Sequence, residues 1–167
     1  KRGKKAGIID LTQGELGTRG TIETRYHEAA KAAIVMGVHV RENLKMRDGF
    51  FKNDEAHQLQ LIQAIRKYQP DIVIGNVLHD RHPDHGKGHR LVKDACFLSG
   101  LIKIEVKDAH GHDLPPWRPK AVYAYIQDYY LEPDIVIDVT DEWEERTKSL
   151  MCFESQFYNP NSDEPET

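Results

Sequence analysis

The stretch that decides the fold is Ile72-Val-Ile-Gly-Asn-Val-Leu-His-Asp-Arg-His-Pro-Asp-His-Gly-Lys-Gly-His89. It opens with an apolar run, which predicts a strand that is buried in a sheet. Pro83 predicts the first turn of a helix, because its missing N–H would have no partner there in any case, and the apolar residues from Leu91 to Leu98 continue with helical spacing. Four of the nine histidines and two aspartates therefore fall where a buried strand gives way to a helix. Titratable groups are unfavourable at such a place unless they take part in chemistry.

Working outward from this stretch, strands and helices are expected to alternate along the chain. We expect strands at about 4–10, 38–44, 71–76, 120–127 and 135–139, and helices at about 21–36, 54–69, 83–100 and 141–153. Several of the strands are rich in valine and isoleucine throughout, which favours a parallel or mostly parallel sheet with helices on both faces. The predicted fold class is therefore α/β.

Composition excludes several classes of protein. The chain has 167 residues, of which 39% are hydrophobic and 30% charged, as in a folded soluble domain. No apolar run approaches the roughly 20 residues that span a bilayer, and a net charge of −4 predicts no nucleic-acid partner. Cys96 and Cys152 form no CxxC pattern, which is typical of thiols in a reducing cytoplasm. We therefore expect a cytoplasmic protein without membrane or nucleic-acid partners.

Both ends of the chain resemble internal positions of a longer domain. The basic start, Lys1–Lys5, runs directly into the first predicted strand, as the end of a helix and its loop would. The acidic, turn-rich end, Tyr158–Thr167, contains no segment that could join a core. We therefore expect residues 1–167 to be a single domain that is cut at both ends.

A glycine-rich loop, Gln13–Thr21, follows the first predicted strand and precedes a helix. This is where open α/β sheets bind ligands, although the loop matches no nucleotide-binding signature. Arg19 is a candidate clamp for a carboxylate or for sugar hydroxyls; the alternative is a surface salt bridge. Arg25 and Glu28, three residues apart on the next helix, are expected to be an ordinary surface pair.

His82-Pro-Asp-His85 is the strongest candidate for chemistry. Positions three apart on a first helical turn share one side, so both imidazoles are expected to face the crevice at the carboxyl end of the sheet. One could bind a metal as a neutral imidazole and the other could donate or shuttle a proton. Asp80 or Asp84 could hold a ring nitrogen in the required tautomer. The alternative is a set of helix-capping and turn residues. For His89 we favour a surface position on the helix over a place in the site, and His79 is expected to lie in the loop.

A hydrolytic zinc site needs about three protein ligands and an open position for water. The chain has no HExxH motif and no second cluster of histidines and acids. The remaining ligands are therefore either scattered along the chain or supplied by residues that it does not contain.

Two segments together resemble a known family: Asp10–Thr21 and His82–His85. Shorter matches are Arg41–Phe51, Asp94–Gly100 and Ser155–Tyr158. The chain resembles the LmbE-like (PIG-L) zinc-dependent deacetylases, and in particular those of bacillithiol biosynthesis that remove acetyl from N-acetylglucosaminyl malate. The resemblance implies a Rossmann-like fold, a divalent metal that is usually zinc, a small N-acetylated amino sugar conjugate as substrate, and a homo-oligomer.

The resemblance also implies roles for individual residues. His85 would be a metal ligand, and His82 would stabilise the oxyanion or assist protonation. Asp84 would orient this pair, and Arg19 would contact the substrate. The family's first motif, Ala-His-Pro-Asp-Asp, which carries two ligands and the general base, is not in the chain and is expected before Lys1.

Two other interpretations stay open at this point. The chain could be a degenerate, non-catalytic sugar-binding domain of the same fold, which the absence of Ala-His-Pro-Asp-Asp in the complete protein would favour. It could also be a different metal-dependent hydrolase, which activity on esters or phosphoesters rather than amides would favour.

Overall fold

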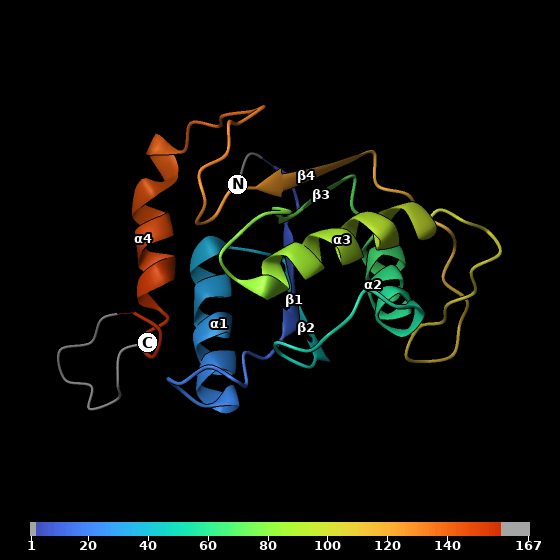
Figure 1. The fold of residues 1–167 in the computed structure, drawn as a ribbon, viewed down its shortest axis with the longest axis horizontal. Helices are drawn as coiled ribbons and strands as arrows, with labels where there is room; N and C mark the ends of the chain where they lie inside the picture. The colour runs from blue at the N-terminus through green and yellow to red at the C-terminus, as the bar shows by residue number, and fades with distance from the viewer. Residues whose placement is uncertain (1–2, 158–167) are drawn as a thin grey trace. The chain divides into compact units, whose positions relative to one another are not determined.

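The structure is a computed structural model that describes residues 3–157, so the turn-rich end predicted at Tyr158–Thr167 lies outside the described residues. The chain divides into two compact units. Unit 1 combines Lys1–Asp48 with Ile135–Thr167, and unit 2 is Gly49–Asp134. Figure 1 shows the path of the chain, with helices and strands in alternation as predicted. Within residues 3–157, no helix has both the length and the apolar character that crossing a bilayer requires.

Unit 1 is built on a β-α-β arrangement. Strand β1, Gly7–Thr12, pairs in parallel with β2, Val40–Met46, and helix α1, Ile22–Met36, connects them. The sequence predicts both ends of α1, because the Thr21 hydroxyl accepts from the N–H of Thr24 at 3.1 Å and Gly37 adopts the left-handed conformation with φ of 62°. The short η1 turn, Thr140–Glu142, leads into α4, Trp143–Met151, which lies against α1.

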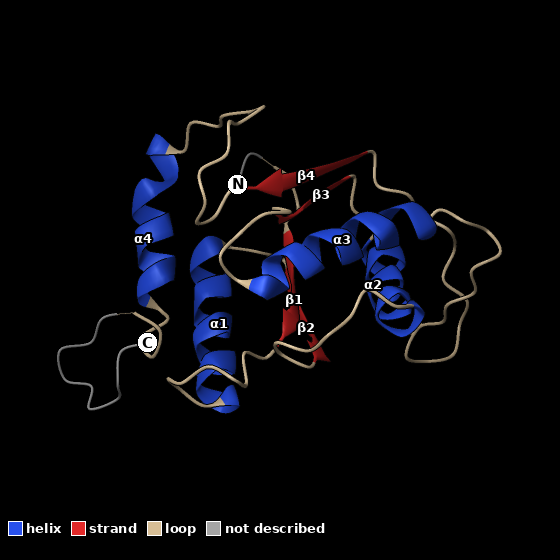
Figure 2. Cartoon of the chain, in the orientation of Figure 1, coloured by secondary structure: helices blue, strands red, loops and turns tan. Residues whose placement is uncertain are grey.

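The strand that we predicted at 135–139 is wrong. These residues form no strand and belong to the loop between β4 and η1, as Figure 2 shows. The side chains of Ile135, Val136 and Ile137 are all exposed. An apolar, β-branched sequence favours a pleated strand only where a neighbouring strand accepts its hydrogen bonds, and none of the described strands pairs with this segment.

Unit 2 pairs strand β3, Ile72–Asn76, with β4, Ala121–Tyr125, again in parallel. Helix α2, Glu55–Tyr68, leads into β3, and helix α3, Pro83–Leu98, follows it. Helix α3 lies against both α2 and β3. The observed bounds of both helices agree with the sequence prediction. The chain therefore has the α/β class and the parallel pairing that we expected, and its described strands form two separate two-stranded sheets.

Strand β3 differs from its prediction in burial. Its Gly75 faces α3, since a Cβ at this position would lie 3.2 Å from a methyl carbon of Val92. Successive side chains of a strand point to opposite faces, so Ile72 and Ile74 lie on the other face, where they are 56% and 60% exposed. An apolar run alone predicts that a strand is covered on both faces, and here only the α3 side is covered.

The two cysteines differ in environment, which predicts different reactivity. Cys96 on α3 is 3% exposed, and burial raises the pKa of its thiol to about 11. Cys152 is only partly buried, and its thiol donates to the carbonyl of Lys148 at 3.3 Å. Because the thiolate is the reactive form, a disulfide reagent at about pH 8 is expected to modify Cys152 in the folded chain and Cys96 only on unfolding. Colorimetric counting of thiols with and without denaturant checks this, and rapid reaction of a Cys152→Ser chain would contradict it.

Candidate active site

His82 occupies the N-cap position of α3, immediately before Pro83. Its ring Nδ1 accepts a hydrogen bond from the main-chain N–H of Asp84 at 3.2 Å. A nitrogen that accepts a hydrogen bond carries no hydrogen of its own, so the neutral ring has its hydrogen on Nε2. The capping interpretation of this histidine is therefore correct. The cap also leaves an N–H at the outer nitrogen of an exposed side chain.

His85 lies in the first turn of α3 and has the opposite arrangement. Its Nδ1 lies 2.5 Å from Oδ2 of Asp80. The hydrogen bond to His85 lowers the pKa of Asp80, and main-chain N–H groups lower it further against the effect of burial, so Asp80 is an ionised acceptor at neutral pH. Nδ1 of His85 therefore carries the hydrogen, and Nε2 keeps a free lone pair. Of the two aspartates that we considered for this role, Asp80 is the one that bonds to the ring.

The two rings form a pair with complementary outer nitrogens. Their centroids are 5.0 Å apart and their planes are inclined by 32°. In the neutral state, Nε2 of His82 is a hydrogen-bond donor, whereas Nε2 of His85 carries a free electron pair. A neutral imidazole nitrogen with a free lone pair is the form that binds zinc.

Asp84 is buried, and its carboxylate bonds to groups other than the two histidine rings. It accepts the N–H of Gly49 at 2.7 Å and forms an ion pair with Lys87 at 2.5 Å. Burial alone would raise the pKa of Asp84, but the bonds from Lys87 and Gly49 outweigh it and lower the pKa. The Lys87 ammonium also donates to the Gly49 carbonyl at 2.6 Å, so this group ties the chain at Gly49 to the start of α3. The contact between Asp84 and His82 is made by the main chain, and an orienting role for the carboxylate stays a prediction.

Several polar contacts around the pair were missed by the sequence analysis. Asn76, at the end of β3, donates its side-chain amide to Gln127 at 2.8 Å and to the Tyr125 hydroxyl at 3.1 Å. The main-chain carbonyl of Asn76 accepts a hydrogen bond from Nδ1 of His89 at 2.8 Å, so His89 joins α3 to the end of β3. The signal for these contacts is the polar run directly after β4, because adjacent parallel strands place their carboxyl ends at one edge of a sheet.

Arg19 belongs to unit 1, whereas His82, Asp84 and His85 belong to unit 2. The carbonyl of Arg19 accepts from Arg25 at 2.7 and 3.2 Å and from the amide of Gln156 at 2.9 Å. These bonds fix the glycine-rich loop at its last residues. The Nε of Arg19 is buried and has no hydrogen-bond partner among the described residues, which leaves the guanidinium with unused donor capacity.

The surface pair that we predicted between Arg25 and Glu28 is wrong. Arg25 donates to the glycine-rich loop, and Glu28 is 5% exposed. The two carboxylate oxygens of Glu28 accept from the N–H and the hydroxyl of Ser155, each at 2.7 Å. A charged side chain is stable at this depth because both of its oxygens are satisfied.

A complete metal centre is not formed by residues 3–157, which contain no group of three or more His, Cys, Asp or Glu side chains that could hold an ion. The donor chemistry of the pair nevertheless fits zinc in part, because Nε2 of His85 is a suitable ligand atom. The described residues thus supply one candidate ligand atom and a neighbouring N–H donor.

Comparison with known proteins identifies the family. Residues 1–96 match the PIG-L family, which is described as GlcNAc-PI de-N-acetylase. The chain belongs to the PIG-L family. This confirms the resemblance to the PIG-L family that rested on the glycine-rich loop and the His82–His85 motif, and the particular resemblance to the bacillithiol deacetylases stays a prediction.

Known proteins and solved structures that are similar to this PIG-L chain are as follows. It is 26% identical over 154 residues to the diacetylchitobiose deacetylase of Thermococcus kodakarensis, covering 90% of the chain but only 56% of the relative. A conserved protein from Thermus thermophilus is 31% identical, with a TM-score of 0.86 and coverage of 93% and 68%. The N,N'-diacetylchitobiose deacetylase of Pyrococcus horikoshii, at 24% identity and a TM-score of 0.82, shares the fold over 95% of this chain and 62% of that one.

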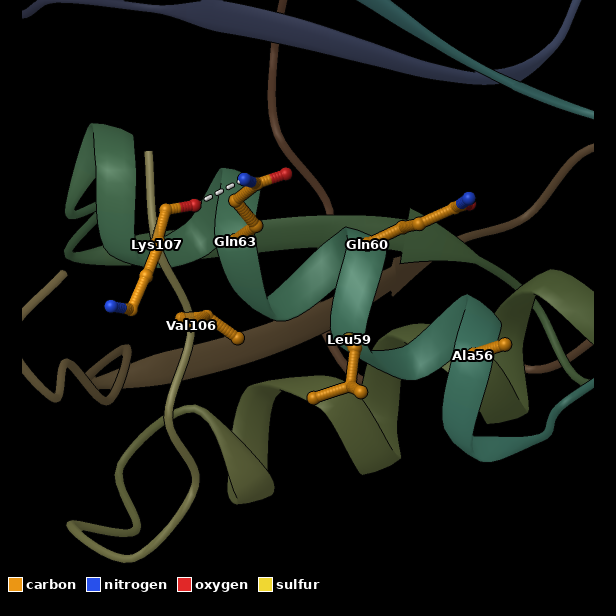
Figure 3. A pocket seen from close by; sticks show the side chains of 6 residues that line it. All are labelled: Ala56, Leu59, Gln60, Gln63, Val106 and Lys107. Atoms are coloured by element: carbon orange, nitrogen blue, oxygen red, sulfur yellow. Dashed lines mark hydrogen bonds between the residues drawn. The ribbon is translucent and has the colours of Figure 1, made fainter. Parts of the chain in front are cut away.

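Two cavities in the described part of this PIG-L chain are lined by residues outside the histidine motif. Figure 3 shows the first, of about 220 Å³, between one side of α2 and the segment at Val106 and Lys107. The amide of Gln63 there donates to the carbonyl of Lys107. The second, of about 230 Å³, shares Leu59 with the first, and neither is lined by a residue of the motif. The titratable residues that line them are Lys107 in the first and Glu55, Lys103 and Glu105 in the second.

Proposed function

We propose that this PIG-L chain is part of a metal-dependent deacetylase that removes the N-acetyl group from an N-acetylglucosamine conjugate. The observation that carries the proposal is the adjacent pair of His82 and His85, whose Nδ1 atoms bond to the N–H of Asp84 and to the carboxylate of Asp80. One adjacent imidazole can hold a metal and the other can donate a hydrogen bond, which is what hydrolysis of an amide at a metal site requires. A set of capping residues alone would not need a second histidine held by a buried carboxylate.

The chain's own residues take separate parts in this reaction. A divalent metal, zinc by preference, would supply Lewis acidity toward the amide carbonyl, and Nε2 of His85 would hold it. The N–H at Nε2 of His82 donates to the carbonyl oxygen as negative charge develops there, which stabilises the transition state more than the ground state. Arg19 has donor capacity to bind a carboxylate or hydroxyl group of the substrate. None of these three residues supplies the general base or the remaining metal ligands.

The substrate class follows from the relatives and from the resemblance. The names of the family and of the Thermococcus kodakarensis relative refer to GlcNAc-PI and to diacetylchitobiose, and both names specify a deacetylase. An N-acetylated glucosamine conjugate is therefore the proposed class, and N-acetylglucosaminyl malate, as in bacillithiol biosynthesis, is the proposed member of it. We further propose that the enzyme is cytoplasmic and a homo-oligomer.

Replacing His85 tests the proposal in the complete protein. His85→Ala is expected to lose the metal and, with it, deacetylation, because Nε2 of His85 is proposed as one of the about three protein ligands that such a site needs. Metal content measured by mass spectrometry and acetate released from N-acetylglucosaminyl malate and from diacetylchitobiose are the two readouts. His112→Ala, in an exposed loop, is the matched control and should match the parent protein in both.

Three outcomes count against the proposal. If metal and amide hydrolysis both survive His85→Ala, the ligand assignment is wrong. If the parent protein binds the sugar conjugates but releases no acetate, the chain is a sugar-binding domain. If it hydrolyses esters or phosphoesters and no amide, it is a hydrolase of another kind.

A further inference from the structure

Asp80 is a buried carboxylate in the loop between β3 and α3. Its side chain has no exposed surface, whereas the side chain of His85 beside it is 32% exposed. Oδ1 of Asp80 accepts the N–H of Arg81 at 2.7 Å, and the main-chain N–H of Asp128 also donates to this carboxylate. Two main-chain donors therefore hold the carboxylate in place, and the third donor is the ring of His85.

We propose that Asp80 is a positioning residue that fixes both the ring orientation and the tautomer of His85, so that Nε2 of His85 is presented as a metal ligand. This inference rests on the proposed function and adds to it a residue outside the His82–His85 motif. Partners of this kind behind a ligating histidine determine which nitrogen is protonated and raise the basicity of the other.

The local geometry explains why Asp80 has this role. The carboxylate accepts from the main chain at two places, at Arg81 in its own loop and at Asp128 after β4. Through Asp80, the position of the His85 ring therefore depends on the segments that follow β3 and β4, and not only on its own helix. Asp84, the other aspartate of the motif, is occupied by Gly49 and Lys87 and cannot serve.

Asp80→Asn is the decisive substitution, because it keeps the shape of the side chain and removes an acceptor. The single carbonyl oxygen of the amide would be used by the main-chain donors, so its NH2 group would face Nδ1 of His85. A donor in that position requires Nδ1 to accept, which moves the ring hydrogen to Nε2 and blocks the ligand atom. We expect the affinity of the complete protein for Zn²⁺ to fall about 10–100-fold.

Asp54→Asn is the matched control. Asp54 bonds to Nδ1 of His57 at the same distance of 2.5 Å, in the first turn of α2 and outside the histidine motif. Asparagine is as good an N-cap as aspartate, so this change removes a carboxylate–imidazole pair without loss of the helix. The Zn²⁺ affinity of Asp54→Asn should equal that of the parent protein.

Two measurements decide the proposal. Competition with a chelating dye gives the Zn²⁺ affinity, and ¹⁵N chemical shifts of the His85 ring in the metal-free protein report the tautomer directly. The parent protein should show hydrogen on Nδ1, and Asp80→Asn should show it on Nε2. If Asp80→Asn fails to fold, the ¹⁵N shifts of the parent protein alone still show which nitrogen of His85 carries the hydrogen.

The outcomes separate this proposal from the proposed function. Hydrogen on Nε2 of His85 in the parent protein overturns the role of Asp80; if that same protein binds Zn²⁺ and releases acetate, the proposed function stands. Unchanged Zn²⁺ affinity in Asp80→Asn, when His85→Ala loses the metal, overturns it as well. A parent protein that binds no Zn²⁺ and releases no acetate, but has the expected tautomer, overturns the proposed function alone.

Discussion

Replacing His82 by alanine is expected to lower the turnover of deacetylation about 10²–10³-fold, which corresponds to the loss of one donor to a developing oxyanion. The metal content is expected to stay at the level of the parent protein, because Nδ1 of His82 is engaged by the N–H of Asp84 and its Nε2 carries hydrogen. KM is expected to change little, since the bond strengthens mainly in the transition state. Steady-state rates of acetate release, together with metal analysis of the same samples, check this prediction.

A control is needed because His82 is also the N-cap of α3. Alanine at an N-cap costs about 0.5–2 kcal/mol of stability, so part of any effect could come from a loosened helix. Asparagine caps a helix well but does not place an N–H where Nε2 of His82 lies. His82→Asn should therefore recover the stability of the parent protein in thermal unfolding and still lack most of the turnover. Recovery of turnover along with stability would show that His82 acts only as a cap.

Much of the fold was predictable because local rules determine it. The caps Thr21 and Asp54 each place an oxygen on a free N–H three residues later, and Gly37 supplies the left-handed residue that ends α1. Pro83 predicts the start of α3, and with it the position of His82 and His85 at the carboxyl end of β3. These features depend on neighbours within one or two turns, which a sequence displays directly.

The features that were missed depend on partners far along the chain. Glu28 is buried because Ser155, 127 residues later, donates to both of its oxygens. Its three-residue spacing from Arg25 predicts a surface pair equally well with or without that partner. The choice of Asp80 over Asp84 likewise required the donors at Gly49 and Asp128, which the motif itself does not reveal.

The segment 135–139 shows the same limit from the opposite side. Its sequence has a stronger β-propensity than that of β1. Yet β1 is a strand, because Val40 and its neighbours in β2 pair with it. Propensity describes what a residue tolerates on a pleated surface, and the pairing decides whether such a surface exists. A sequence pattern therefore predicts helices, which satisfy their own hydrogen bonds, better than it predicts which strands pair.

The second large effect is expected at Arg66, a charged side chain on α2 that is 2% exposed. Its guanidinium donates to four main-chain carbonyls within a single segment. They belong to Ser99 at 2.9 Å, Leu101 at 2.8 Å, Ile104 at 2.7 Å and Leu114 at 3.2 Å. Burial lowers the pKa of Arg66, and the carbonyl dipoles take the place of water around the charge. The guanidinium thus fixes the chain that follows α3 onto α2.

Arg66→Met is expected to destabilise the chain by about 3 kcal/mol or more, although methionine fills much of the same volume. The reason is that four carbonyl groups lose a donor at once. Those of Ser99 and Leu101 keep a main-chain donor, whereas those of Ile104 and Leu114 have no other donor among the described residues, and each buried, unsatisfied group costs about 1–3 kcal/mol. The melting temperature should fall by roughly 6–12 °C for a chain of this size. Arg66→Lys should recover only part of this loss, because one ammonium has three donors and cannot reproduce the planar fork. Arg90→Met, at an exposed position of α3, is the matched control and should change the melting temperature by about a degree. Equal melting temperatures for Arg66→Met and Arg90→Met would show that the carbonyls find other donors.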